Sequence, residues 1–455
     1  MSAAAIEPIV CGRTVHSLDR AVLADVCGTP LADVGQAPRL MAAGALAQAR
    51  RAADGRPVEH ALLVRAAELF ANAELDGETP DEYERRVALG TGLPRGTVRH
   101  ATADIVRAID RLPRTVAAEL PATEQGSGYR TVWVPAGRIF AAVMASNHPA
   151  PNDSWLHALA LGFSVLVRPG TRDPFTARRL VLALLAAGLP AHRVSYLPGS
   201  HAVGSYLLES ADRGIVYGGD EAVARWRGSA SVTTRGPGRS RALLDVAPTD
   251  EVLDHLATAA AYDGGTRCNN ISLVLTTGDV RAVADGLAAR FDKLGGPVVT
   301  APDAVLPAVD AARAEVLAGQ LRGLREELTV HAPVGAEPVT GLPDGSYRPL
   351  PTVLSTDDPR HPAVGLELPF PFVVVAPWRR GEPDLLGGAL VANLLTEDED
   401  IVAGAVADPR IGKVTRGRTL PWAAAPGTPH DGNLSVFLLH PKGIVDMGGK
   451  EDAMA

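Results

Sequence analysis

The residue best suited to covalent chemistry is Cys268, which lies in the segment Asp263–Ser272, D-G-G-T-R-C-N-N-I-S. A helical pattern over Glu251–Tyr262 precedes it, and a β-like apolar run over Ile271–Thr276 follows it. A thiol in a glycine-containing loop between a helix and a strand is a plausible nucleophile position. Taken alone, a free cysteine is more often a buried, inert side chain. The assignment therefore depends on what the rest of the chain places beside it.

The length and composition indicate a multidomain globular protein. Its 455 residues are too many for one ordinary core, so two or three domains are expected. A net charge of −8 argues against a general nucleic-acid binder. The cysteines at 11, 27 and 268 suggest neither a disulfide framework nor a metal site, which fits a reducing cytoplasm. No signal-peptide pattern and no apolar run of ~18 residues is present, so we expect a cytoplasmic location and no membrane partner.

Alternating strand and helix patterns predict an α/β fold. Helical spacing prevails from Arg39 to Leu120, and the clearest alternation covers residues 139–246. This order implies a parallel sheet with helices on both faces, which binds ligands at the carboxyl ends of its strands. Its predicted strands are Ile139–Met144, Ser164–Val167, Val194–Leu197, Gly214–Tyr217 and Ala242–Val246.

A second α/β block is predicted after Asp250, which should cap the helix that leads to Cys268. Its predicted elements are helix Val280–Leu294, strand Val298–Thr300, helix Asp303–Leu321, strand Leu328–Ala332, strand Val373–Ala376, helix Pro383–Leu395 and strand Asn433–Leu439.

Six short motifs accompany Cys268. They are M-A-S-N-H-P (144–149), V-R-P-G-T-R-D-P-F-T-A (167–177), L-P-G-S-H-A-V-G (197–204), Y-G-G-D-E-A-V (217–223), R-G-P-G-R-S (235–240) and E-L-P-F-P-F (367–372). Each is a weak signal alone, because Asn-Pro and Gly-Gly segments are usually turns. In this order and spacing they resemble the aldehyde dehydrogenase superfamily, from about Tyr129 onward.

The resemblance implies an α/β fold with two parallel-sheet domains, a Rossmann-like cofactor domain and a catalytic domain, plus a small oligomerisation flap. The expected bounds are 1–246 for the N-terminal helices and NAD(P)-binding domain, 247–420 for the catalytic domain, and 122–137 with 421–455 for the flap and tail. A homo-oligomer, dimer or tetramer, is also implied, formed through Tyr129–Val134 and the strand at Asn433–Leu439.

The resemblance also assigns roles to single residues. Cys268 would be the nucleophile, and the Asn147 amide would hold the substrate oxyanion. Arg168 stands where a lysine contacts the adenosine ribose, and Glu367 where a glutamate contacts the nicotinamide ribose. Arg168 and Arg172 could bind a 2′-phosphate, which favours NADPH over NADH, or could be merely solvated or paired with Asp173. The other cofactor contacts expected are Gly199, Gly204, Gly218, Gly219, Gly238 and Phe370.

Arg235 is the main departure from the family's pattern. Ordinary members carry E-L-G-G-K-S here, and their glutamate activates the water that releases the acid. Without that base, the chain is most similar to acyl-thioester reductases such as the fatty acyl reductase of bacterial bioluminescence. We therefore predict NADPH-dependent reduction of an acyl-CoA or carrier-bound acyl group to an aldehyde through a Cys268 acyl-enzyme. Arg267 or the oxidised nicotinamide would favour the thiolate.

Three other functions stay open. The chain could be an NAD(P)-dependent aldehyde dehydrogenase that oxidises an aldehyde. It could be a cysteine acyltransferase or thioesterase on the same scaffold, or a non-catalytic homologue whose cofactor site has decayed. Cys11 and Cys27 lack comparable surroundings and are expected to be structural. The acyl group is not readable from the sequence, and the Ala-, Arg- and Gly-rich composition favours a high-GC bacterial source.

Overall fold

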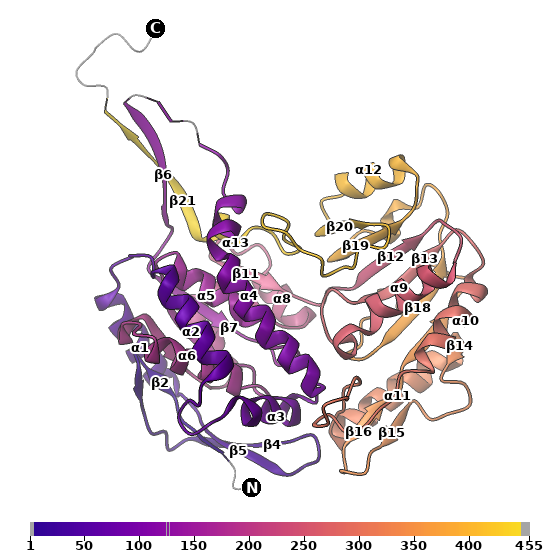
Figure 1. Cartoon of the computed structure of the whole chain (residues 1–455), viewed down its shortest axis with the longest axis horizontal. Coiled ribbons are helices and arrows are strands. Elements are labelled where there is room, and N and C mark those ends of the chain that lie inside the picture. Colours follow the sequence, from indigo (N-terminus) through magenta and orange to yellow (C-terminus); the bar gives the residue numbers. More distant parts are fainter. Residues whose placement is uncertain (1–3, 124, 127, 447–455) are drawn as a thin grey trace.

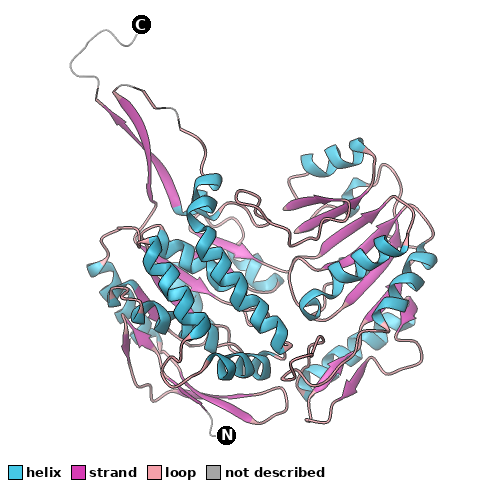
Figure 2. Cartoon of the chain, in the orientation of Figure 1, coloured by secondary structure: helices cyan, strands magenta, loops and turns pink. Residues whose placement is uncertain are grey.

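Two α/β units lie side by side, and a two-stranded arm projects from the first of them (Figure 1). The structure is a computed structural model that describes residues 4–123, 125–126 and 128–446. The last nine residues of the tail predicted over 421–455 lie outside the described residues. Secondary structure is mixed in both units, with helices covering the faces of central sheets (Figure 2). The predicted α/β class with two sheet-based domains is confirmed.

The N-terminal part forms a small sheet and four helices. The sheet contains β1 (Ala4–Ile6), β5 (Pro30–Gly35) and β4 (Arg20–Ala24), and the helices are α1 (Arg39–Ala52), α2 (His60–Asn72), α3 (Pro80–Thr91) and α4 (Arg95–Glu119). The start of α3 shows how local sequence fixes a helix: Thr79 and Glu82 form a capping box around Pro80. The helix ends at Gly92, whose φ of 82° is left-handed.

The first sheet has the strand order β11-β10-β7-β8-β9-β2-β3. Its parallel strands are β7 (Ile139–Val143), β8 (Ser164–Arg168), β9 (Val194–Tyr196), β10 (Arg213–Tyr217) and β11 (Val232–Arg235); β2 (Ile9–Val10) and β3 (Arg13–Thr14) extend one edge. Helices α1 and α7 (His201–Ser210) cover one face, and α5 (Asp153–Ala160) and α6 (Phe175–Ala186) cover the other. The chain leaves β7 toward β8 on one side and returns on the other side as β10. Ligands of such sheets bind where the strand order reverses in this way.

The second sheet has the order β14-β17-β18-β13-β12-β19-β20. Its strands are β12 (Ser240–Leu244), β13 (Ile271–Thr276), β14 (Thr329–Ala332), β17 (Thr352–Ser355), β18 (Phe372–Pro377), β19 (Val391–Leu395) and β20 (Lys413–Arg416). Helices α9 (Asp250–Ala261) and α10 (Val280–Phe291) pack on one face, and α11 (Ala311–Glu327) and α12 (Glu399–Ala407) on the other. Helix α8 (Asp220–Trp226) belongs to the first unit, and the ribbon β15 (Val339–Gly341) with β16 (Tyr347–Pro349) to the second.

Several predicted elements are wrong. The strand predicted over Ala242–Val246 exists as β12 but belongs to the second sheet, where it pairs with β13 and β19. The helix predicted over Pro383–Leu395 is a 3₁₀ turn followed by β19, because a strand buried on both faces lacks the period-two pattern that separates it from a helix. No strand forms at Val298–Thr300 in the described chain, and the helix predicted over Asp303–Leu321 begins only at Ala311.

The projecting arm pairs β6 (Tyr129–Pro135) with β21 (Leu439–Val445) in antiparallel register (Figure 1). The strand predicted over Asn433–Leu439 is wrong, because α13 (Leu434–Leu438) occupies most of that range and β21 begins only at its end. The Ser435 amide donates to Glu119 Oε2 at 2.8 Å, which fixes the start of α13 on the end of α4. The C-terminal chain therefore returns from the second unit to the first.

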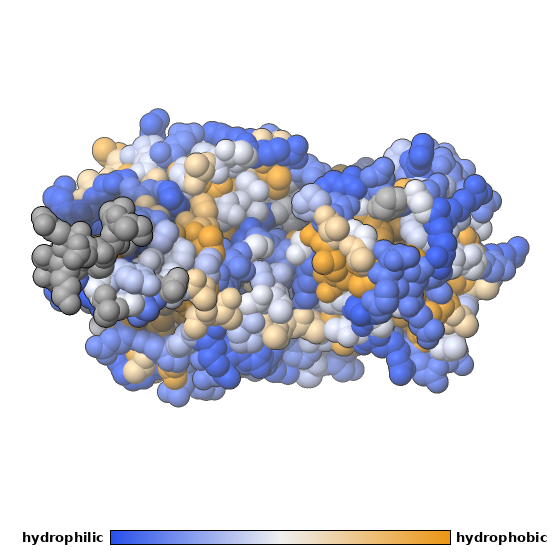
Figure 3. Space-filling view, turned by 90° about the horizontal axis from the view of Figure 1, so that it is seen from above, coloured by the Kyte–Doolittle hydropathy of each residue, from blue (hydrophilic) through white to orange (hydrophobic). Residues whose placement is uncertain are grey.

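Within the described residues, no helix has both the length and the apolar composition that crossing a membrane requires. On the face seen from above, apolar surface occurs in separate patches among hydrophilic surface (Figure 3).

Candidate active site

The carboxyl edge of the first sheet meets the amino edge of the second. β11 ends at Arg235 and β12 begins at Ser240, so only a four-residue turn separates the two sheets. Cys268 comes shortly before β13, and Glu367 comes shortly before β18, which places both at the amino edge of the second sheet. Asn147 follows β7, the central parallel strand of the first sheet. The fold thus brings the predicted nucleophile and the predicted oxyanion donor to the junction of the two units.

Gly238 touches the backbone of Cys268. A Cβ at position 238 would lie 1.6 Å from the Cys268 carbonyl oxygen, so only glycine fits. The same oxygen accepts a hydrogen bond from Ser240 Oγ at 3.1 Å, and the Gly238 carbonyl accepts one from the Leu390 amide at 2.8 Å. The R-G-P-G-R-S motif therefore positions the cysteine loop, a role that the sequence alone did not suggest.

The Cys268 thiol is half-buried and protonated at neutral pH in the free protein. Burial raises its pKa to about 12, and the carboxylates of Asp431 and Glu367 raise it further, while Arg267 opposes them. Arg267 favours the thiolate, as predicted, but burial and the two carboxylates outweigh its effect on the pKa of Cys268. Its guanidinium donates to Asp263 and to Asp104, both at 2.6 Å, so its charge is already compensated.

Asp263 is the centre of a tightly bonded group beside the cysteine loop. Its buried carboxylate accepts from His100 Nδ1 at 2.8 Å and from Arg267 Nε at 2.6 Å, and His148 Nε2 lies 3.7 Å away. Burial alone would raise the pKa of Asp263, but these cationic and donor contacts outweigh it and lower the pKa to about 2. Asp263 also has a φ of 52°, which is rare for a residue with a side chain. The Asp263 carboxylate is therefore ionised at neutral pH.

His148 is buried directly after Asn147. Its Nδ1 accepts from the Ala150 amide at 3.2 Å, which assigns the proton of the neutral ring to Nε2. No described residue lies within hydrogen-bonding distance of that Nε2. Burial lowers the pKa of His148, so the ring is neutral at pH 7. The Asn147 side chain is exposed and has no hydrogen-bond partner among the described residues, so it is free to bind a ligand.

The loop 421–432 covers the same region from the C-terminal side. The Trp422 ring stacks on Tyr262 with centroids 4.2 Å apart, and Arg267 lies over the Tyr262 ring at 5.1 Å. Further along the loop, Asp431 Oδ2 lies 3.5 Å from Arg235 Nε and 3.3 Å from His430 Nε2.

Asp153, at the start of α5, belongs to the same region. Burial raises its pKa to about 7, and the negative charges of Asp104 and Asp431 add to the effect while Arg235 opposes it. Arg235 therefore lowers the pKa of Asp153 through its charge and lies 3.5 Å from Asp431.

The expected cofactor residues of the first unit gather at the ends of β8 and β9. Arg168 is the last residue of β8; its Nε donates to the Gly199 carbonyl at 3.0 Å, and its buried Nη2 has no partner among the described residues. A Cβ at Gly204 would lie 3.3 Å from Val143, so glycine keeps α7 close to β7. A buried guanidinium nitrogen without a partner suits an anionic or hydroxyl-bearing ligand.

Other expected cofactor residues have different surroundings. Arg172 donates to the Gly90 carbonyl at 2.7 Å and to Asp310 at 3.0 Å, so it links the two units. The Phe370 ring is 1% exposed and packs edge-to-face on Phe372. Glu367 Oε2 accepts from the Arg239 amide at 2.5 Å, and burial raises its pKa.

Gly219 caps the short helix α8, and a Cβ at Gly218 would lie 2.7 Å from Ala222. Whether these residues and the other expected contacts bind a cofactor stays a prediction.

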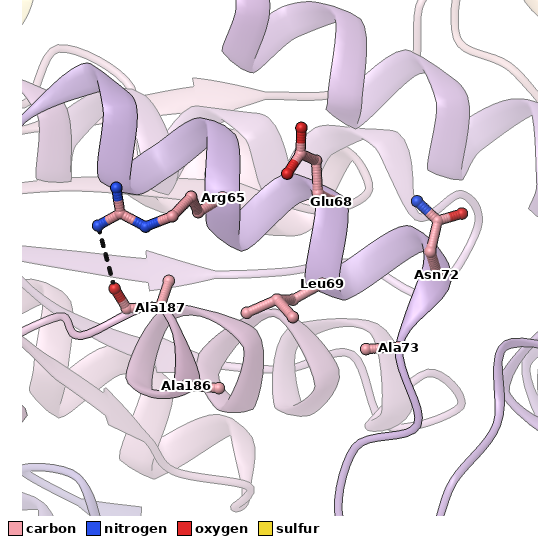
Figure 4. A pocket seen from close by; sticks show the side chains of 7 residues that line it. All are labelled: Arg65, Glu68, Leu69, Asn72, Ala73, Ala186 and Ala187. Atoms are coloured by element: carbon pink, nitrogen blue, oxygen red, sulfur yellow. Dashed lines mark hydrogen bonds between the residues drawn. The ribbon is translucent and has the colours of Figure 1, made fainter.

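Two cavities lie away from the thiol. One of about 520 Å³ is lined by α4, α9, the turn 262–264 and the end of α10, and both His100 and Asp263 line it. The other, of about 560 Å³, lies between α2 and the end of α6 and is lined by Arg65, Glu68, Leu69, Asn72, Ala73, Ala186 and Ala187 (Figure 4). None of these seven residues is a cysteine, serine or histidine, so this second cavity offers no nucleophile.

The chain belongs to the aldehyde dehydrogenase family, whose model matches residues 16–383. Its relatives include malonate-semialdehyde dehydrogenase 2 of Geobacillus thermodenitrificans, 26% identical over 50% of each chain. They also include a probable methylmalonate-semialdehyde/malonate-semialdehyde dehydrogenase [acylating] of Drosophila pseudoobscura pseudoobscura, 23% identical over 69% of this chain and 63% of the relative. The chain spans about half the length of the curated relatives that it matches first.

The structure agrees with the family assignment. An indole-3-acetaldehyde dehydrogenase solved with NAD⁺ superimposes with a TM-score of 0.83 at 19% identity, over 97% of this chain and 96% of that one. The predicted superfamily is confirmed. The narrower prediction of an acyl-CoA reductase branch is not, because the relatives carry the names of aldehyde-oxidising dehydrogenases.

Sequence reasoning did not single out Asp263, His148 and Asp431, which the structure places around the site. Asp263 and His148 lay inside the quoted motifs beside Cys268 and Asn147, so their proximity to candidate residues was the available signal. Asp431 carried no such signal, because it is 163 residues from Cys268 and lies in a Pro/Gly-rich loop.

Proposed function

We propose that this protein oxidises an aldehyde with a nicotinamide cofactor, through a covalent intermediate on Cys268. The observation that carries the proposal is the position of Cys268, at the junction where the carboxyl edge of the first sheet meets the amino edge of the second. The free Asn147 side chain and the Glu367 carboxylate come to the same junction. Family membership supports an oxidoreductase over a thioesterase or acyltransferase.

The chemistry follows from these side chains. Cys268 Sγ bonds to the aldehyde carbon, and the Asn147 amide donates to the oxygen on which negative charge develops. A bound nicotinamide cofactor supplies the hydride acceptor. Departure of the hydride leaves a thioester on Cys268, and an acyl acceptor then releases the product.

The residues of the first unit fit a dinucleotide. Arg168, whose Nη2 has no partner among the described residues, ends β8. Gly199, whose carbonyl accepts from Arg168 Nε, follows the neighbouring strand β9. This is where parallel sheets of this kind bind ligands. The preference for NADPH over NADH stays a prediction. It depends on Arg168 and Arg172 as ligands of a 2′-phosphate, and Arg172 already donates a hydrogen bond to Asp310.

We propose a thiol, such as that of coenzyme A, as the acyl acceptor. Arg235 occupies the place where ordinary members have a water-activating glutamate, and a guanidinium cannot act as a base. The word "acylating" in the name of the Drosophila relative supports the same acceptor. Run backwards, the reaction is the reduction of an acyl thioester to an aldehyde, which is the second candidate function.

The test is aldehyde-dependent formation of reduced cofactor, with NAD⁺ and NADP⁺, with and without coenzyme A. Malonate semialdehyde and small aliphatic aldehydes are the first substrates to try, given the names of the relatives. Cys268→Ala should abolish turnover, since a nucleophile typically cannot be replaced. Cys27→Ala should leave it intact as the matched control. Full activity of the Cys268 variant would contradict the proposal.

We also propose a homo-oligomer formed through the projecting arm. Its strands β6 and β21 pair only with each other in the described chain, so both outer edges are open to a further strand. Light scattering of the full chain against a variant with Val132→Pro and Ile444→Pro tests this. An unchanged mass would contradict it.

A further inference from the structure

We propose that His148 is a positioning residue: its Nε2–H faces Asp263 across the unit junction and fixes the adjacent Asn147 relative to Cys268. The inference rests on the proposed function, because Asn147 is the donor to the substrate oxygen there. Such a donor stabilises a transition state only when it is aimed at the place where the charge develops. Asn147 follows a strand of the first unit and Cys268 precedes a strand of the second, so a contact between the units is needed to set their distance.

The Asn147 turn is held by its two neighbours. No hydrogen bond of Asn147 itself, from backbone or side chain, is found in the described part of the chain. On one side, Ser146 Oγ accepts from the Arg172 amide at 3.0 Å, a contact within the first unit. On the other side, the His148 ring is buried. His148 is therefore the neighbour that can connect this turn with the second unit.

The two ring nitrogens of His148 have different surroundings. Nδ1 accepts from the Ala150 amide at 3.2 Å, which leaves the proton of the neutral ring on Nε2. Nε2 is buried and makes no hydrogen bond with a described residue, and Asp263 Oδ2 lies 3.7 Å from it. Leaving a buried donor without an acceptor is unfavourable, so a movement of less than about 1 Å that closes this gap lowers the free energy.

Asp263 is a fixed reference point for the cysteine loop. Its Oδ1 accepts from His100 Nδ1 of α4 at 2.8 Å, and its Oδ2 accepts from Arg267 Nε at 2.6 Å. Arg267 directly precedes Cys268 in the chain. A hydrogen bond from His148 to this carboxylate therefore joins the turn of the first unit to the loop that carries the thiol.

The chain contains a second turn with the same local sequence, H-P-A at 361–363. There His361 Nδ1 accepts from the Ala363 amide, also at 3.2 Å, and its Nε2 bonds to Glu327 Oε2 at 3.1 Å. An H-P-A turn can thus be capped by Nδ1 and bind a carboxylate through Nε2 at the same time. The Glu327 side chain is 65% exposed, whereas that of Asp263 is 2% exposed. No hydrogen bond joins His361 to a candidate site residue within the described chain, so this turn is a matched control.

The test replaces each half of the imidazole separately. His148→Asn keeps an acceptor near the position of Nδ1, so it can still cap the turn at Ala150, but its side chain is too short to reach Asp263. His148→Gln places an amide donor near the position of Nε2. His148→Asn should lower kcat of aldehyde-dependent cofactor reduction by about 10-fold or more, because an oxyanion donor contributes about 10²–10³-fold and a misaimed one loses part of this. His148→Gln should retain most of kcat, KM for the cofactor should stay unchanged in both, and His361→Asn should match wild type.

A double-mutant cycle with Asn147→Ala distinguishes positioning from a merely structural role. A residue that acts through Asn147 has nothing left to position once the amide is gone, so His148→Asn should cause no further loss of kcat in the Asn147→Ala background. If His148 only stabilises the fold, the two losses should multiply, which overturns the inference. Equal losses from His148→Asn and His148→Gln, or no loss from His148→Asn, overturn it as well.

The outcomes separate this inference from the proposed function. A wild-type protein without aldehyde-dependent turnover would overturn the proposed function and this inference with it. Normal turnover of Asn147→Ala would overturn this inference alone, since the chemistry of Cys268 would then proceed without the donor. Thermal unfolding shows whether each variant folds. If His148→Asn does not fold, Asp263→Glu, which retains the charge but moves the carboxylate, replaces it in the cycle with the same expected results.

Discussion

Two groups of charged side chains flank Cys268, and they differ in how tightly they are bonded. Around Asp263, the contacts to His100 and Arg267 measure 2.6 to 2.8 Å, and the carboxylate has a pKa of about 2 because these contacts outweigh its burial. Around Asp431, the contacts measure 3.3 to 3.5 Å, and burial raises the pKa of the neighbouring Asp153 to about 7. Asp263 is a fixed charge at neutral pH, whereas Asp153 in the second group can gain or lose a proton there.

The difference indicates that the two groups have different roles. A fixed, fully bonded carboxylate is suited to holding a loop in a strained conformation, and Asp263 has a positive φ. A carboxyl group whose pKa lies near 7, such as that of Asp153, is suited to moving protons. Variants that remove one of these carboxylates, or the aromatic contact between the loop 421–432 and Tyr262, test the comparison.

The largest stability effect is expected from Asp263→Asn. It leaves the partly buried Arg267 with one carboxylate partner fewer, and breaking a buried ion pair typically costs about 3–5 kcal/mol. Urea unfolding gives the change in the free energy of unfolding. Asp220→Asn removes the exposed partner of Arg239 and serves as the control, since exposed pairs contribute about 0–1 kcal/mol. Equal effects of the two variants would remove the proposed structural role of Asp263.

The next expected effect is a dependence of stability on pH, caused by Asp153. Asp153 has a folded pKa of about 7 because of burial, above its usual 3.8, so the folded state binds the proton more tightly than the unfolded state. Its contribution to stability is complete below about pH 4 and is lost as the pH rises through 7. Asp153→Asn should therefore unfold at higher urea concentration than wild type at pH 8, with a smaller difference at pH 5. A difference independent of pH would contradict the assignment.

Asp263 should show the opposite dependence on pH. Its folded pKa of about 2 lies below the usual 3.8, so its contribution is complete above about pH 4 and is lost as the pH falls toward 2. The wild-type protein should lose stability over this acid range more steeply than Asp263→Asn does. Parallel curves from urea unfolding at pH 5, 4 and 3 would show that the fixed charge does not stabilise the fold.

The smallest stability effect is expected from Trp422→Ala, which removes the stacking contact between the loop 421–432 and Tyr262. Trp422 joins the loop that carries Asp431 to Tyr262, the neighbour of Asp263. Stacked aromatic pairs contribute about 0.5–1.5 kcal/mol beyond their buried area, so Tm should fall by only a few degrees. Turnover should fall more than stability, because this contact holds the loop 421–432 against Tyr262, in the segment that leads to Cys268. Tyr262→Phe retains the ring and should preserve both, and a stability loss without a turnover loss would show that the loop 421–432 does not contribute to the site.

The sequence by itself determined the fold class, the alternating strands of the first sheet and the family. These follow from local patterns: glycine turns, helix caps and apolar runs specify elements wherever they occur in the chain. It also placed Cys268, Asn147 and Arg168 at loops and strand ends, where the structure has them. Buried strands such as β19 were mistaken for helix because burial on both faces erases the two-residue period.

Only the tertiary structure decided the environment of the nucleophile. The sequence placed Arg267 beside Cys268, which suggested a cation that activates the thiol. The fold bonds that cation to Asp263 and Asp104, and brings Asp431 across the unit junction from a distant loop. Charge compensation and burial depend on groups far apart in sequence, so the spacing of residues cannot reveal them. The same limit explains why β12 was assigned to the wrong sheet, since the residue pattern of a strand does not determine which strands it pairs with.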